Sequence, residues 1–396
     1  MNLDKKMIKN NIPRIRFNNF EAFWVEKRIA DIVKISAGGD VDKVKLKESG
    51  KYPVIANALT NKGIVGFYED YKVKAPAVTV TGRGDVGYAV ARHENFTPIV
   101  RLLTLQSEKI DVDYLENQIN SMRILNESTG VPQLTAPQLG NYKVYHPKIE
   151  EQSAIGTLFR TLDDLLSSYK DNLANYQSLK ATMLSKMFPK AGQTVPEIRL
   201  NGFDGEWEVQ SLKELASFSK GNGYTKSDLV NSGNEIILYG QLYTNYQTVI
   251  SMVNTFVLET REKSVISKGG EVIVPASGES AEDISRASVI EKSGVIIGGD
   301  LNIIYPDENK VDSIFLALTI SNGSQQKELI KRAQGKSVVH LRNNDLEKVV
   351  LHYPSMEEQR AIGLYFSNLD NLINSYQEKI SQLETLKKKL LQDMFI

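Results

Sequence analysis

The chain has 396 residues, of which 41% are hydrophobic and 24% charged, and its 48 basic and 48 acidic residues give a formal net charge of zero. This composition is typical of a globular chain with two or more domains, and its neutral total gives no electrostatic reason to expect a polyanionic partner. The lack of cysteine excludes disulfides and thiolate metal sites, and a charged start without an apolar run predicts a cytoplasmic protein with no signal peptide and no membrane span.

The first body of the chain, residues 1–147, is predicted to be mixed α and β. Short apolar or alternating runs separated by glycine-rich turns predict strands, and a helix is expected at Val112–Ile124. This body carries 21 Lys and Arg against 16 Asp and Glu, or +5, so its charge would steer it toward a polyanion. The expected strands are Tyr52–Ala56, Ala77–Val80, Gly87–Ala91 and Ile99–Leu103.

A long helix is expected next, over residues 148–188, and a second over 355–396. Each shows apolar residues at steps of three and four, which is the heptad pattern of a coiled coil. Asn172 and Lys379 interrupt the pattern at matching places, and we expect them in the seam, where they lower stability and help to fix the register. The residues predicted to pack the two helices together are Leu158, Leu162, Leu165, Tyr169, Tyr176, Leu179, Leu369, Leu372, Tyr376, Leu383, Leu386 and Leu390.

We favour two helices packed antiparallel on each other over two amphipathic helices that each cover their own domain. A helix of about 39 residues is ~58 Å long, whereas a domain of ~150 residues has a radius of gyration of only ~15 Å and cannot cover it. A two-fold relation between the repeats would make the helices antiparallel.

Between the helices lie a linker, residues 189–195, and a second body, residues 196–354. The second body repeats the plan of the first, but the linker and second body together (residues 189–354) carry 17 basic and 21 acidic residues, or −4, which weakens an argument for a polyanionic partner. Strands are expected at Glu235–Tyr239, Glu271–Pro275, Val295–Ile297 and Leu301–Tyr305, and a helix at Asp312–Ile320.

The chain is an internal duplication. Trp24 and Trp207 lie in matching segments 183 residues apart, and the segments Pro147–Gln152 and Pro354–Gln359 match at 207 residues, so the middle of the second copy is longer by 207 − 183 = 24 residues. Two similar bodies indicate two similar targets.

Three motifs with the letters of a catalytic site are interpreted as ordinary loops. The sequence from Gly82 to Gly87 fits G-x-G-x-x-G, but a β-type run follows it where a dinucleotide site needs a helix, so a tight hairpin is expected. Gly335-Lys336-Ser337 lacks the first glycine of a P-loop, and the acids in 306–310 share one turn. The four histidines are not spaced as metal ligands.

The whole chain resembles the specificity subunits of type I restriction-modification enzymes (the HsdS family). The resemblance rests on the pattern P-x-x-E-Q-x-x-I followed by L-D, which occurs at Pro147–Ile155 with Leu162-Asp163 and again at Pro354–Ile362 with Leu369-Asp370. The segments around Trp24 and Trp207 and the stretch Thr81–Gly84 also match.

This resemblance implies an α+β fold with two α/β target-recognition domains, related by a pseudo-two-fold axis and separated by a long antiparallel two-helix coiled coil. Each domain would read one half of an asymmetric bipartite DNA site, with an unread spacer set by the helices. The implied segments are target-recognition domain 1 (1–147), spacer helix 1 (148–188), the linker (189–195), target-recognition domain 2 (196–354) and spacer helix 2 (355–396).

The resemblance also implies partners. The helices would dock two methyltransferase (HsdM-type) subunits and, indirectly, motor-nuclease (HsdR-type) subunits that act in phage defence. S-adenosylmethionine, ATP and Mg²⁺ would lie on those partners, and the chain itself would hold no cofactor and no metal and would catalyse nothing alone. Its role would be to direct an adenine-N6 DNA methyltransferase and an ATP-dependent endonuclease to their sites.

Candidate DNA contacts are loop residues with the side chains that bind phosphates or base edges. They are Lys62, Lys72, Lys74 and Arg83 in the first body, and Asn222, Gln241, Asn245 and Lys336 in the second. Two other readings remain open at this point. One is a protein-interaction scaffold without a DNA role, and the other is a nucleotide-binding enzyme that uses the Gly82 or Lys336 loop.

Overall fold

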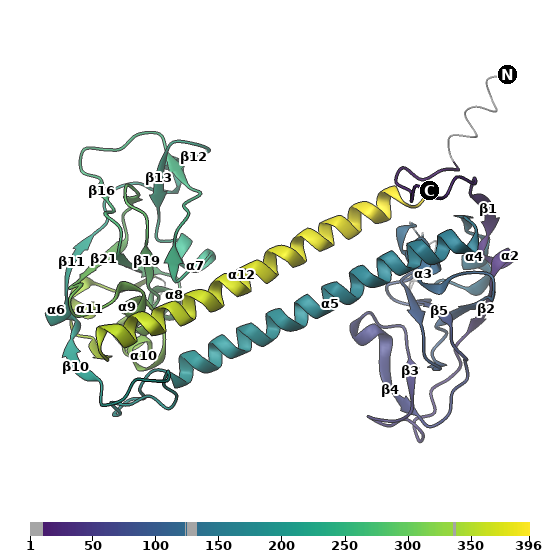
Figure 1. Ribbon diagram of the computed structural model, residues 1–396, viewed down its shortest axis with the longest axis horizontal. Helices are drawn as coiled ribbons and strands as arrows, with labels where there is room; N and C mark the ends of the chain where they lie inside the picture. The colour runs from purple at the N-terminus through teal and green to yellow at the C-terminus, as the bar shows by residue number, and fades with distance from the viewer. Residues whose placement is uncertain (1–10, 123, 125–132, 336–337) are drawn as a thin grey trace. The chain divides into compact units, whose positions relative to one another are not determined.

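The first body is built on an antiparallel sheet with the strand order β2-β8-β5-β6, and helix α3 packs on β5 and β6 (Figure 1). The computed structural model describes residues 11–122, 124, 133–335 and 338–396. Asp111 caps α3 by accepting a hydrogen bond from the Tyr114 amide, and Leu115 and Ile119 on its buried face pack against the sheet. The sheet strands are β2 (Lys34–Ala37), β5 (Ala77–Val80), β6 (Ala89–Arg92) and β8 (Leu103–Gln106), and α3 is Val112–Ser121.

A smaller sheet, β4-β3-β7, and a two-stranded sheet, β1-β9, complete the first body. Their strands are β1 (Val25–Arg28), β3 (Tyr52–Ile55), β4 (Ile64–Tyr68), β7 (Thr97–Pro98) and β9 (Lys143–His146). The short helices are α2 (Ile29–Ile32), η1 (Thr60–Gly63) and α4 (Ala136–Asn141).

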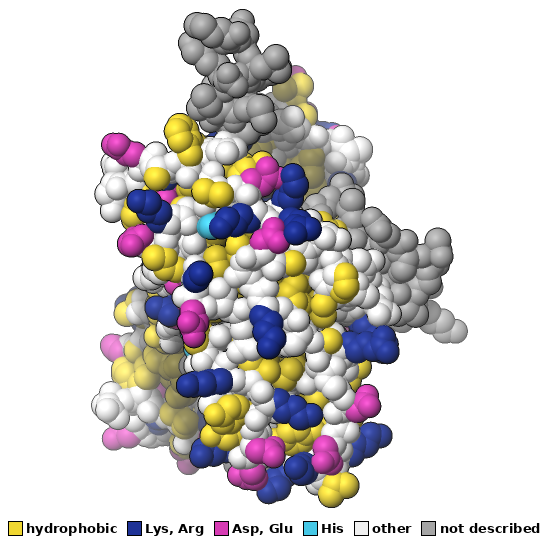
Figure 2. Space-filling model, turned by 90° about the vertical axis from the view of Figure 1, so that its right-hand side faces the viewer, with side chains coloured by type: hydrophobic (Ala, Val, Ile, Leu, Met, Phe, Trp, Pro, Cys, Tyr) yellow, Lys and Arg dark blue, Asp and Glu magenta, His cyan; other side chains and the backbone are white. Residues whose placement is uncertain are grey.

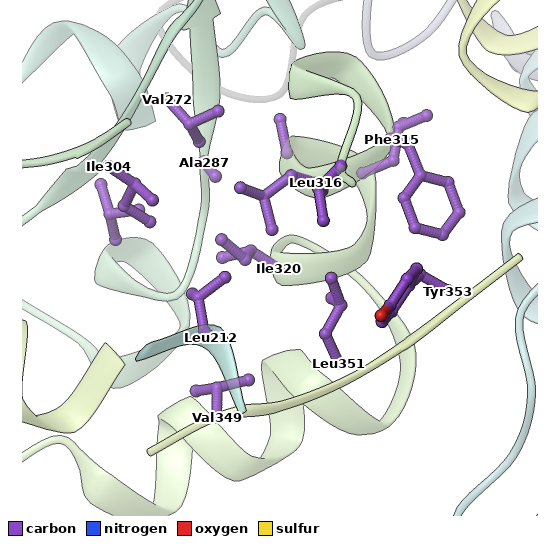
Figure 3. Close-up of a cluster of buried hydrophobic side chains, with 14 of the residues drawn as sticks. Leu212, Val272, Ala287, Ile304, Phe315, Leu316, Ile320, Val349, Leu351 and Tyr353 are labelled. Carbon is purple, nitrogen blue, oxygen red and sulfur yellow. The ribbon is translucent and has the colours of Figure 1, made fainter. Parts of the chain in front are cut away.

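The second body has the same plan with a larger main sheet, β11-β21-β17-β19-β14, and helix α9 in the position of α3. Figure 3 shows Leu316 and Ile320 of α9 on the side of Val272 and Ile304 of this sheet, whereas Phe315 lies nearer Tyr353. The strands of the main sheet are β11 (Ala216–Lys220), β14 (Val249–Ile250), β17 (Glu271–Pro275), β19 (Ser288–Ile290) and β21 (Leu301–Pro306), and α9 is Ser313–Ile320.

The rest of the second body consists of a sheet β12-β15-β13-β20-β16, the pairs β10-β23 and β18-β22, and short helices. The strands are β10 (Glu208–Ser211), β12 (Leu229–Val230), β13 (Asn234–Ile237), β15 (Phe256–Val257), β16 (Val265–Ile266), β18 (Ser277–Gly278), β20 (Ile296–Ile297), β22 (Val339–His340) and β23 (Val350–Tyr353). The helices are α6 (Leu212–Leu215), η2 (Lys226–Asp228), α7 (Gln241–Thr244), α8 (Ala281–Ile284), α10 (Gly323–Arg332) and α11 (Asn343–Leu346).

Most of the strands predicted from the sequence are present, but the run Ile99–Leu103 is not one strand. Val100 and Arg101 have φ of 52° and 59°, so the chain turns there, and β8 begins only at Leu103. The apolar letters of this run could not reveal the turn, because neither residue favours the left-handed region. Helix α10 was not predicted, and α3 ends at Ser121 rather than at Ile124.

The two long helices are α5 (Ile149–Lys186) and α12 (Met356–Asp393), each of 38 residues. The chain divides into two units, and the divisions fall inside these helices rather than at their ends. Unit 1 is Met1–Asp171 with Gln377–Ile396, and unit 2 is Asn172–Tyr376. Each unit therefore contains one body and a part of both helices.

Within each unit the two helices run antiparallel and share one seam. In unit 1 Asp163 and Lys170 of α5 pair with Lys387 and Glu384 of α12, so the partner number falls as the α5 number rises. Unit 2 has the same order, with Tyr176 against Tyr376 and Lys180 against Asp370. The antiparallel pairing predicted from the sequence is therefore present in both units.

The seam follows a heptad phase that differs from the predicted one at every second position. The burial pattern shows that the seam is lined by residues at alternating steps of four and three. They are Ile155, Phe159, Leu162, Leu166, Tyr169, Leu173, Tyr176, Lys180 and Met183 of α5, with Met187 directly after it, and Ile362, Phe366, Leu369, Ile373, Tyr376, Ile380, Leu383, Lys387 and Leu390 of α12, with Met394 directly after it. The two sets match one for one at 207 residues.

Five residues that we expected to pack in the seam lie off it in this phase, namely Leu158, Leu165, Leu179, Leu372 and Leu386, and Leu158 and Leu372 are partly buried. Leu165, Leu179 and Leu386 are 37, 36 and 45% exposed and lie on the flank of the helix pair. Both phases share every second position, and because leucines occupy both sets, the spacing alone did not decide between them. The polar positions of the seam are Lys180 and Lys387, and not Asn172 and Lys379.

A buried ion pair fastens each body to the start of its long helix. In unit 1 Arg16 donates two hydrogen bonds to Glu151, at 2.6 and 2.7 Å, and a third to the carbonyl of Ala22. In unit 2 Arg199 binds Glu358 in the same way, at 2.7 and 2.6 Å. Glu151 and Glu358 are 2 and 1% exposed, so the paired glutamates of the repeated motif hold the joint together.

The glutamine of the same motif connects the long helix to α3 or α9. Gln152 Oε1 accepts a hydrogen bond from the backbone amide of Asp111, the capping residue of α3, and Gln359 does the same for Asp312, the capping residue of α9. Each glutamine also donates to the proline carbonyl that precedes its helix. The Glu-Gln pair is therefore a structural joint between body and helix.

The far end of each long helix closes on a body in the same way. In unit 1 the amide of Ile15 donates to the carbonyl of Asp393 at 2.9 Å, and in unit 2 the amide of Ile198 donates to Lys186 at 2.9 Å. Phe395 then packs on the core of unit 1 and Phe188 on that of unit 2. In unit 2 the two bonded segments are joined by the linker, whereas in unit 1 they come from opposite ends of the sequence.

Candidate nucleic-acid interface

Asn57 joins three loops of the first body. Its Oδ1 accepts a hydrogen bond from the Gly82 amide at 2.7 Å, and its Nδ2 donates to the Val100 carbonyl at 2.6 Å. Two further segments are tied in by the backbone, because Leu134 donates to Gly82 at 2.9 Å and Arg101 donates to Gly38 at 3.0 Å. We call these segments the first loop cluster, which comprises Gly38–Gly39, Asn57, residues 81–88, Val100–Arg101 and Gln133–Leu134.

The backbone of this cluster is strained. Val100 and Arg101 are both in the left-handed region, which costs roughly 1–2 kcal/mol for a residue with a side chain and is least favourable for a β-branched one. In the neighbouring turn that follows Asn57, Asn61 and Lys62 have φ of 48° and 50°. Strain of this kind is concentrated at functional sites, so the cluster is a candidate site.

Cationic side chains surround the first loop cluster. Arg83 follows Gly82, Arg101 lies in the strained turn, and Lys72 Nζ lies 3.9 Å from where a Cβ on Gly39 would be. Among the described residues, none of these three cations nor Lys62 has an acidic partner within ion-pair distance. They are therefore available to bind an anion.

Arg92 holds the turn that carries Lys62. It lies on β6 and is 8% exposed, and it donates to Thr79 Oγ1 at 2.9 Å and to the Lys62 carbonyl at 2.7 Å. Burial lowers the pKa of Arg92 to about 10, which leaves it charged at neutral pH. Its role is to position Lys62, which is itself exposed.

Lys74, another predicted contact, does not belong to the cluster. Its carbonyl accepts a hydrogen bond from Gln106 Nε2 at 2.9 Å, and Gln106 is the last residue of β8. Lys74 precedes the first residue of β5 and Arg83 follows its last residue, so the two lie at opposite ends of this strand. The structure thus brings three of the four predicted residues of the first body together and leaves Lys74 at the other end of the sheet.

The second body contains an equivalent loop cluster. Gly221 donates to the carbonyl of Leu301 at 2.9 Å as Gly38 does to Leu102 at 2.8 Å, and Leu341 donates to Ala276 at 3.0 Å as Leu134 does to Gly82. Bridge partners also correspond, with Arg83 opposite Gln133 and Ser277 opposite His340. The second loop cluster therefore comprises Gly221–Asn222, Ala276–Ser277, Gly299–Asp300 and His340–Leu341.

A glycine is required at the same place in both clusters. A Cβ on Gly38 would lie 2.7 Å from the Ile99 amide nitrogen, and one on Gly221 would lie 1.9 Å from the Gly298 carbonyl oxygen. These approaches are too close for any side chain, so both glycines allow one loop to pass directly against another. The clusters share a scaffold and differ in their side chains.

The predicted contacts of the second body have different environments. Asn222 is exposed in the second loop cluster, although its Nδ2 donates to the Lys263 carbonyl at 2.9 Å. Gln241 is bound at both ends of its amide, by the Leu238 backbone and by Thr255 Oγ1, which favours a structural role. Asn245 is exposed at the end of α7, at the rim of a cavity of about 130 Å³. Lys336 lies outside the described residues.

Three residues of the clusters were not predicted as contacts, namely Arg101, Asp300 and His340. Arg101 was assigned to a strand, and Asp300 sits in a glycine-rich stretch that indicates only a turn. His340 is one of four scattered histidines, and its position in the sequence gave no sign of a site. No local sequence signal could have joined these positions, because the hydrogen bonds that bring them together connect segments far apart in the chain.

The motifs interpreted as ordinary loops have no catalytic geometry in the described residues. The Gly82 loop connects the antiparallel strands β5 and β6, so no helix N-terminus follows to bind a pyrophosphate. No group of three or more His, Asp or Glu side chains in the described residues could hold a metal ion. Across that same part of the chain, every helix is too short or too polar to cross a membrane.

Figure 2 shows a face of the molecule on which Lys and Arg side chains are interspersed with Asp and Glu. Such a surface produces a weak overall field, in agreement with the net charge of zero. Binding to a nucleic acid would then depend on cations at particular positions, such as those of the first loop cluster, rather than on a broad basic face.

Comparisons with known proteins give one answer. The family model "Type I restriction modification DNA specificity domain" matches the chain twice, over residues 22–175 and 204–385. A type I restriction enzyme MjaVIII specificity subunit of Methanocaldococcus jannaschii is 22% identical over 93% of this chain and 91% of its own length. A putative type I restriction enzyme MjaX specificity subunit of the same organism is 20% identical over 97% and 95%.

A solved structure has the same fold. The crystal structure of a type I restriction-modification system S subunit from M. genitalium superposes with a TM-score of 0.67 at 16% identity, covering 97% of this chain and 99% of that one. Together with the two matches of the family model, which include most of the chain, this comparison decides among the alternatives left open by the sequence. The chain belongs to the family of type I restriction-modification DNA specificity subunits.

Proposed function

We propose that each body reads one half of an asymmetric bipartite DNA site. The observation that carries this proposal is the pair of loop clusters, which share a backbone scaffold and carry different side chains at equivalent positions. Identical bodies would read a palindrome, whereas these would read unlike half-sites. The first body offers cations to the phosphates, and the second offers a more polar, partly acidic surface.

Exchange of one body tests this modular reading. Residues 196–354 would be replaced by the corresponding segment of another family member, and the methylated adenines of cells that carry the hybrid would be mapped. Only one half-site should change, since the first body is untouched. A change in both half-sites, or no dependence of the methylated sequence on this chain, contradicts the proposal.

We infer that the flank of the helix pair docks two copies of a methyltransferase subunit. Leu165 and Leu386 are exposed in unit 1 and occupy the same heptad position, one before a seam residue, on facing helices. Leu179 and Leu372 are their counterparts in unit 2. Leu372 is partly buried, so the unit 2 patch is the less exposed of the two, but two corresponding apolar patches in a duplicated chain fit two copies of one partner.

Substitution on one patch tests the stoichiometry. The double variant Leu165→Asp, Leu386→Asp should bind one methyltransferase subunit instead of two, as measured by native mass spectrometry of the purified complex. Leu364→Asp is the matched control, because Leu364 is 63% exposed but lies on the outer side of α12, away from the flank. Loss of no subunit in the double variant, or equal loss in the control, argues against this docking site.

The helices are proposed to set the length of the unread spacer. Insertion of one heptad into both helices at matching places keeps the seam in phase and adds about 10 Å, or about three base pairs of DNA. The mapped site should keep both half-sites and gain a longer spacer. An unchanged spacer would show that something other than helix length sets it.

The methyl transfer itself is assigned to the partners. The methyltransferase subunits would bind S-adenosylmethionine and methylate adenine N6, and a motor-nuclease subunit would use ATP and Mg²⁺. The purified chain alone should transfer no methyl group to DNA and cleave none, and activity should appear when the methyltransferase subunit is added. Salt-dependent DNA binding by that complex separates this role from a scaffold without a DNA role.

A further inference from the structure

Arg101 and Asp300 occupy the same position in the two loop clusters. Leu102 accepts the hydrogen bond of Gly38, and Leu301 accepts that of Gly221, so the residue before each leucine is equivalent. Arg101 and Asp300 also share an unusual backbone conformation, with φ of 59° and 58°. The equivalence therefore rests on two independent observations, the hydrogen-bond partners and the backbone angles.

Neither side chain is required by the fold. Both residues are exposed, and within the described residues neither has an ion-pair or hydrogen-bond partner for its charged group. Glycine adopts this backbone conformation at the lowest cost. Asparagine and aspartate adopt it at a lower cost than arginine but a higher cost than glycine. The presence of an exposed arginine in a strained turn points to a use of its side chain outside the chain.

The chemistry of the two side chains is opposite. An arginine offers five donors in a planar fork and binds the O6 and N7 acceptors of guanine in the major groove. A carboxylate only accepts, and on a base edge it can bind the N4 amino group of cytosine. A carboxylate does not bind a phosphate, so an exposed Asp300 in this position is compatible with a base edge and not with the DNA backbone.

We propose that residues 101 and 300 are equivalent specificity-determining positions, where Arg101 reads a guanine in one half-site and Asp300 reads the amino group of a cytosine in the other. This inference rests on the proposed function and adds the residue, the base and the type of hydrogen bond. The cations that hold the phosphates next to that base are Arg83 of the first loop cluster and, beside the cluster, Lys62 and Lys72.

The test uses glycine variants of the full chain in complex with its methyltransferase partner. Arg101→Gly and Asp300→Gly remove the side chain and also relieve the backbone strain, so neither variant should fold less well than the wild type. Methylomes of cells carrying each variant would be compared. We expect Arg101→Gly to lose discrimination at one guanine by about 10- to 100-fold and to leave the other half-site unchanged.

Asp300→Gly should relax one cytosine position in the other half-site and leave the first half-site unchanged. Lys74→Ala is the matched control, because Lys74 is exposed on the same body but lies at the opposite end of the sheet; its recognised sequence should be that of the wild type. The exchange Asp300→Arg should replace the cytosine preference by a guanine preference at the same position.

Two results would overturn the proposal. If Arg101→Gly leaves the recognised sequence unchanged and reduces the salt dependence of DNA binding by about one phosphate contact, Arg101 binds the backbone. If either variant relaxes both half-sites, the positions do not read separate halves. Failure of the proposed function looks different, because the wild-type chain itself would then direct no methylation to a bipartite site.

Discussion

The ammonium group of Lys387 in α12 lies against the carboxylate of Asp163 in α5, inside a seam that is otherwise mostly apolar. Lys180 and Asp370 repeat the contact in unit 2, at positions 207 residues away from their counterparts. A shift of one heptad would separate each lysine from its aspartate and place it among leucine and isoleucine side chains. The two pairs therefore fix the register of the antiparallel helices, as polar seam residues do in other coiled coils.

Loss of one lysine should weaken the helix pair locally. Lys387→Met keeps the shape of the side chain but leaves Asp163 without its cation, and we expect a loss of about 1–2 kcal/mol in the local unfolding free energy of unit 1, measured by hydrogen exchange. Lys170→Ala is the control, because the pair between Lys170 and Glu384 is about half exposed on both sides and should contribute less than about 0.5 kcal/mol. Equal effects of the two variants would contradict the special role of Lys387.

Glu116 should make the stability of unit 1 fall as the pH rises. The pKa of Glu116 is raised from 4.5 to about 7, chiefly by burial and also by the nearby Asp163 carboxylate, while Lys387 acts in the opposite direction. Since this pKa is higher in the folded state, the folded protein holds more protons between pH 4.5 and 7, and stability decreases across that interval. The difference between a pKa of 4.5 in the unfolded state and about 7 in the folded state corresponds to a loss of at most about 3 kcal/mol in the free energy of unfolding.

The variant Glu116→Gln removes this dependence. At pH 8 it should be more stable than the wild type, and at pH 4 the two should be similar, because the wild-type carboxyl is then neutral in both states. Hydrogen exchange of α3 and α5 between pH 5 and 8, corrected for the intrinsic exchange rate, would measure the difference. Parallel curves for the two proteins would show that Glu116 does not titrate in this range.

The two buried joints should differ in strength. Glu151 binds Arg16 and also accepts a hydrogen bond from Trp24 Nε1 at 3.3 Å. Trp207 Nε1 has no hydrogen-bond partner among the described residues, so Glu358 has one partner fewer. Both Glu151→Ala and Glu358→Ala should cost about 3–5 kcal/mol by leaving a buried arginine unpaired, and the first should cost about 1 kcal/mol more.

Hydrogen exchange of each unit measures both costs in one experiment, with the untouched unit as the internal reference. Glu151→Gln keeps the shape and one acceptor oxygen, and it should recover part of the loss. A smaller cost for Glu151→Ala than for Glu358→Ala would show that the bond to Trp24 contributes nothing.

Two glycine-to-alanine variants distinguish a steric clash from an unfavourable backbone angle as the cause of lost stability. Gly221→Ala should destabilise the second body by more than about 2 kcal/mol, because its Cβ would overlap the Gly298 carbonyl. Gly202→Ala should cost only about 1 kcal/mol, since Gly202 has φ of 93° but nothing within 4 Å of its Cβ position. Thermal unfolding with hydrogen exchange of the second body would rank the two variants.

The fold was predictable where the sequence repeats a pattern over many residues. Both long helices and most strands lie where spacing and turn residues indicate them, because these signals are local. The seam phase was predicted wrongly because the leucines at 165 and 179 compete with those at 166 and 173, and only the packed partner decides which set is buried. Lys180 and Lys387 fill seam positions that an apolar pattern cannot identify.

The candidate site was less predictable for a related reason. The first loop cluster is assembled by Asn57 from segments that lie 25 and 43 residues away in the chain, and no local pattern indicates such contacts. The flanking glycines identify Arg83 as a loop residue and so as a candidate contact, whereas Arg101 lies in a run with β-type letters. Gln241 had the right side chain for a base contact, but its own body uses both ends of it.

The matching closures at Asp393 and Lys186 have a consequence for how such a chain can be encoded. One closure is spanned by a peptide and the other is not, yet the surrounding packing is the same. A reading frame that opened between Phe188 and Ile198, with a short bridge from Phe395 to Ile15, would preserve every contact described for the two units. We therefore expect a chain that begins with the second copy to form the same two units.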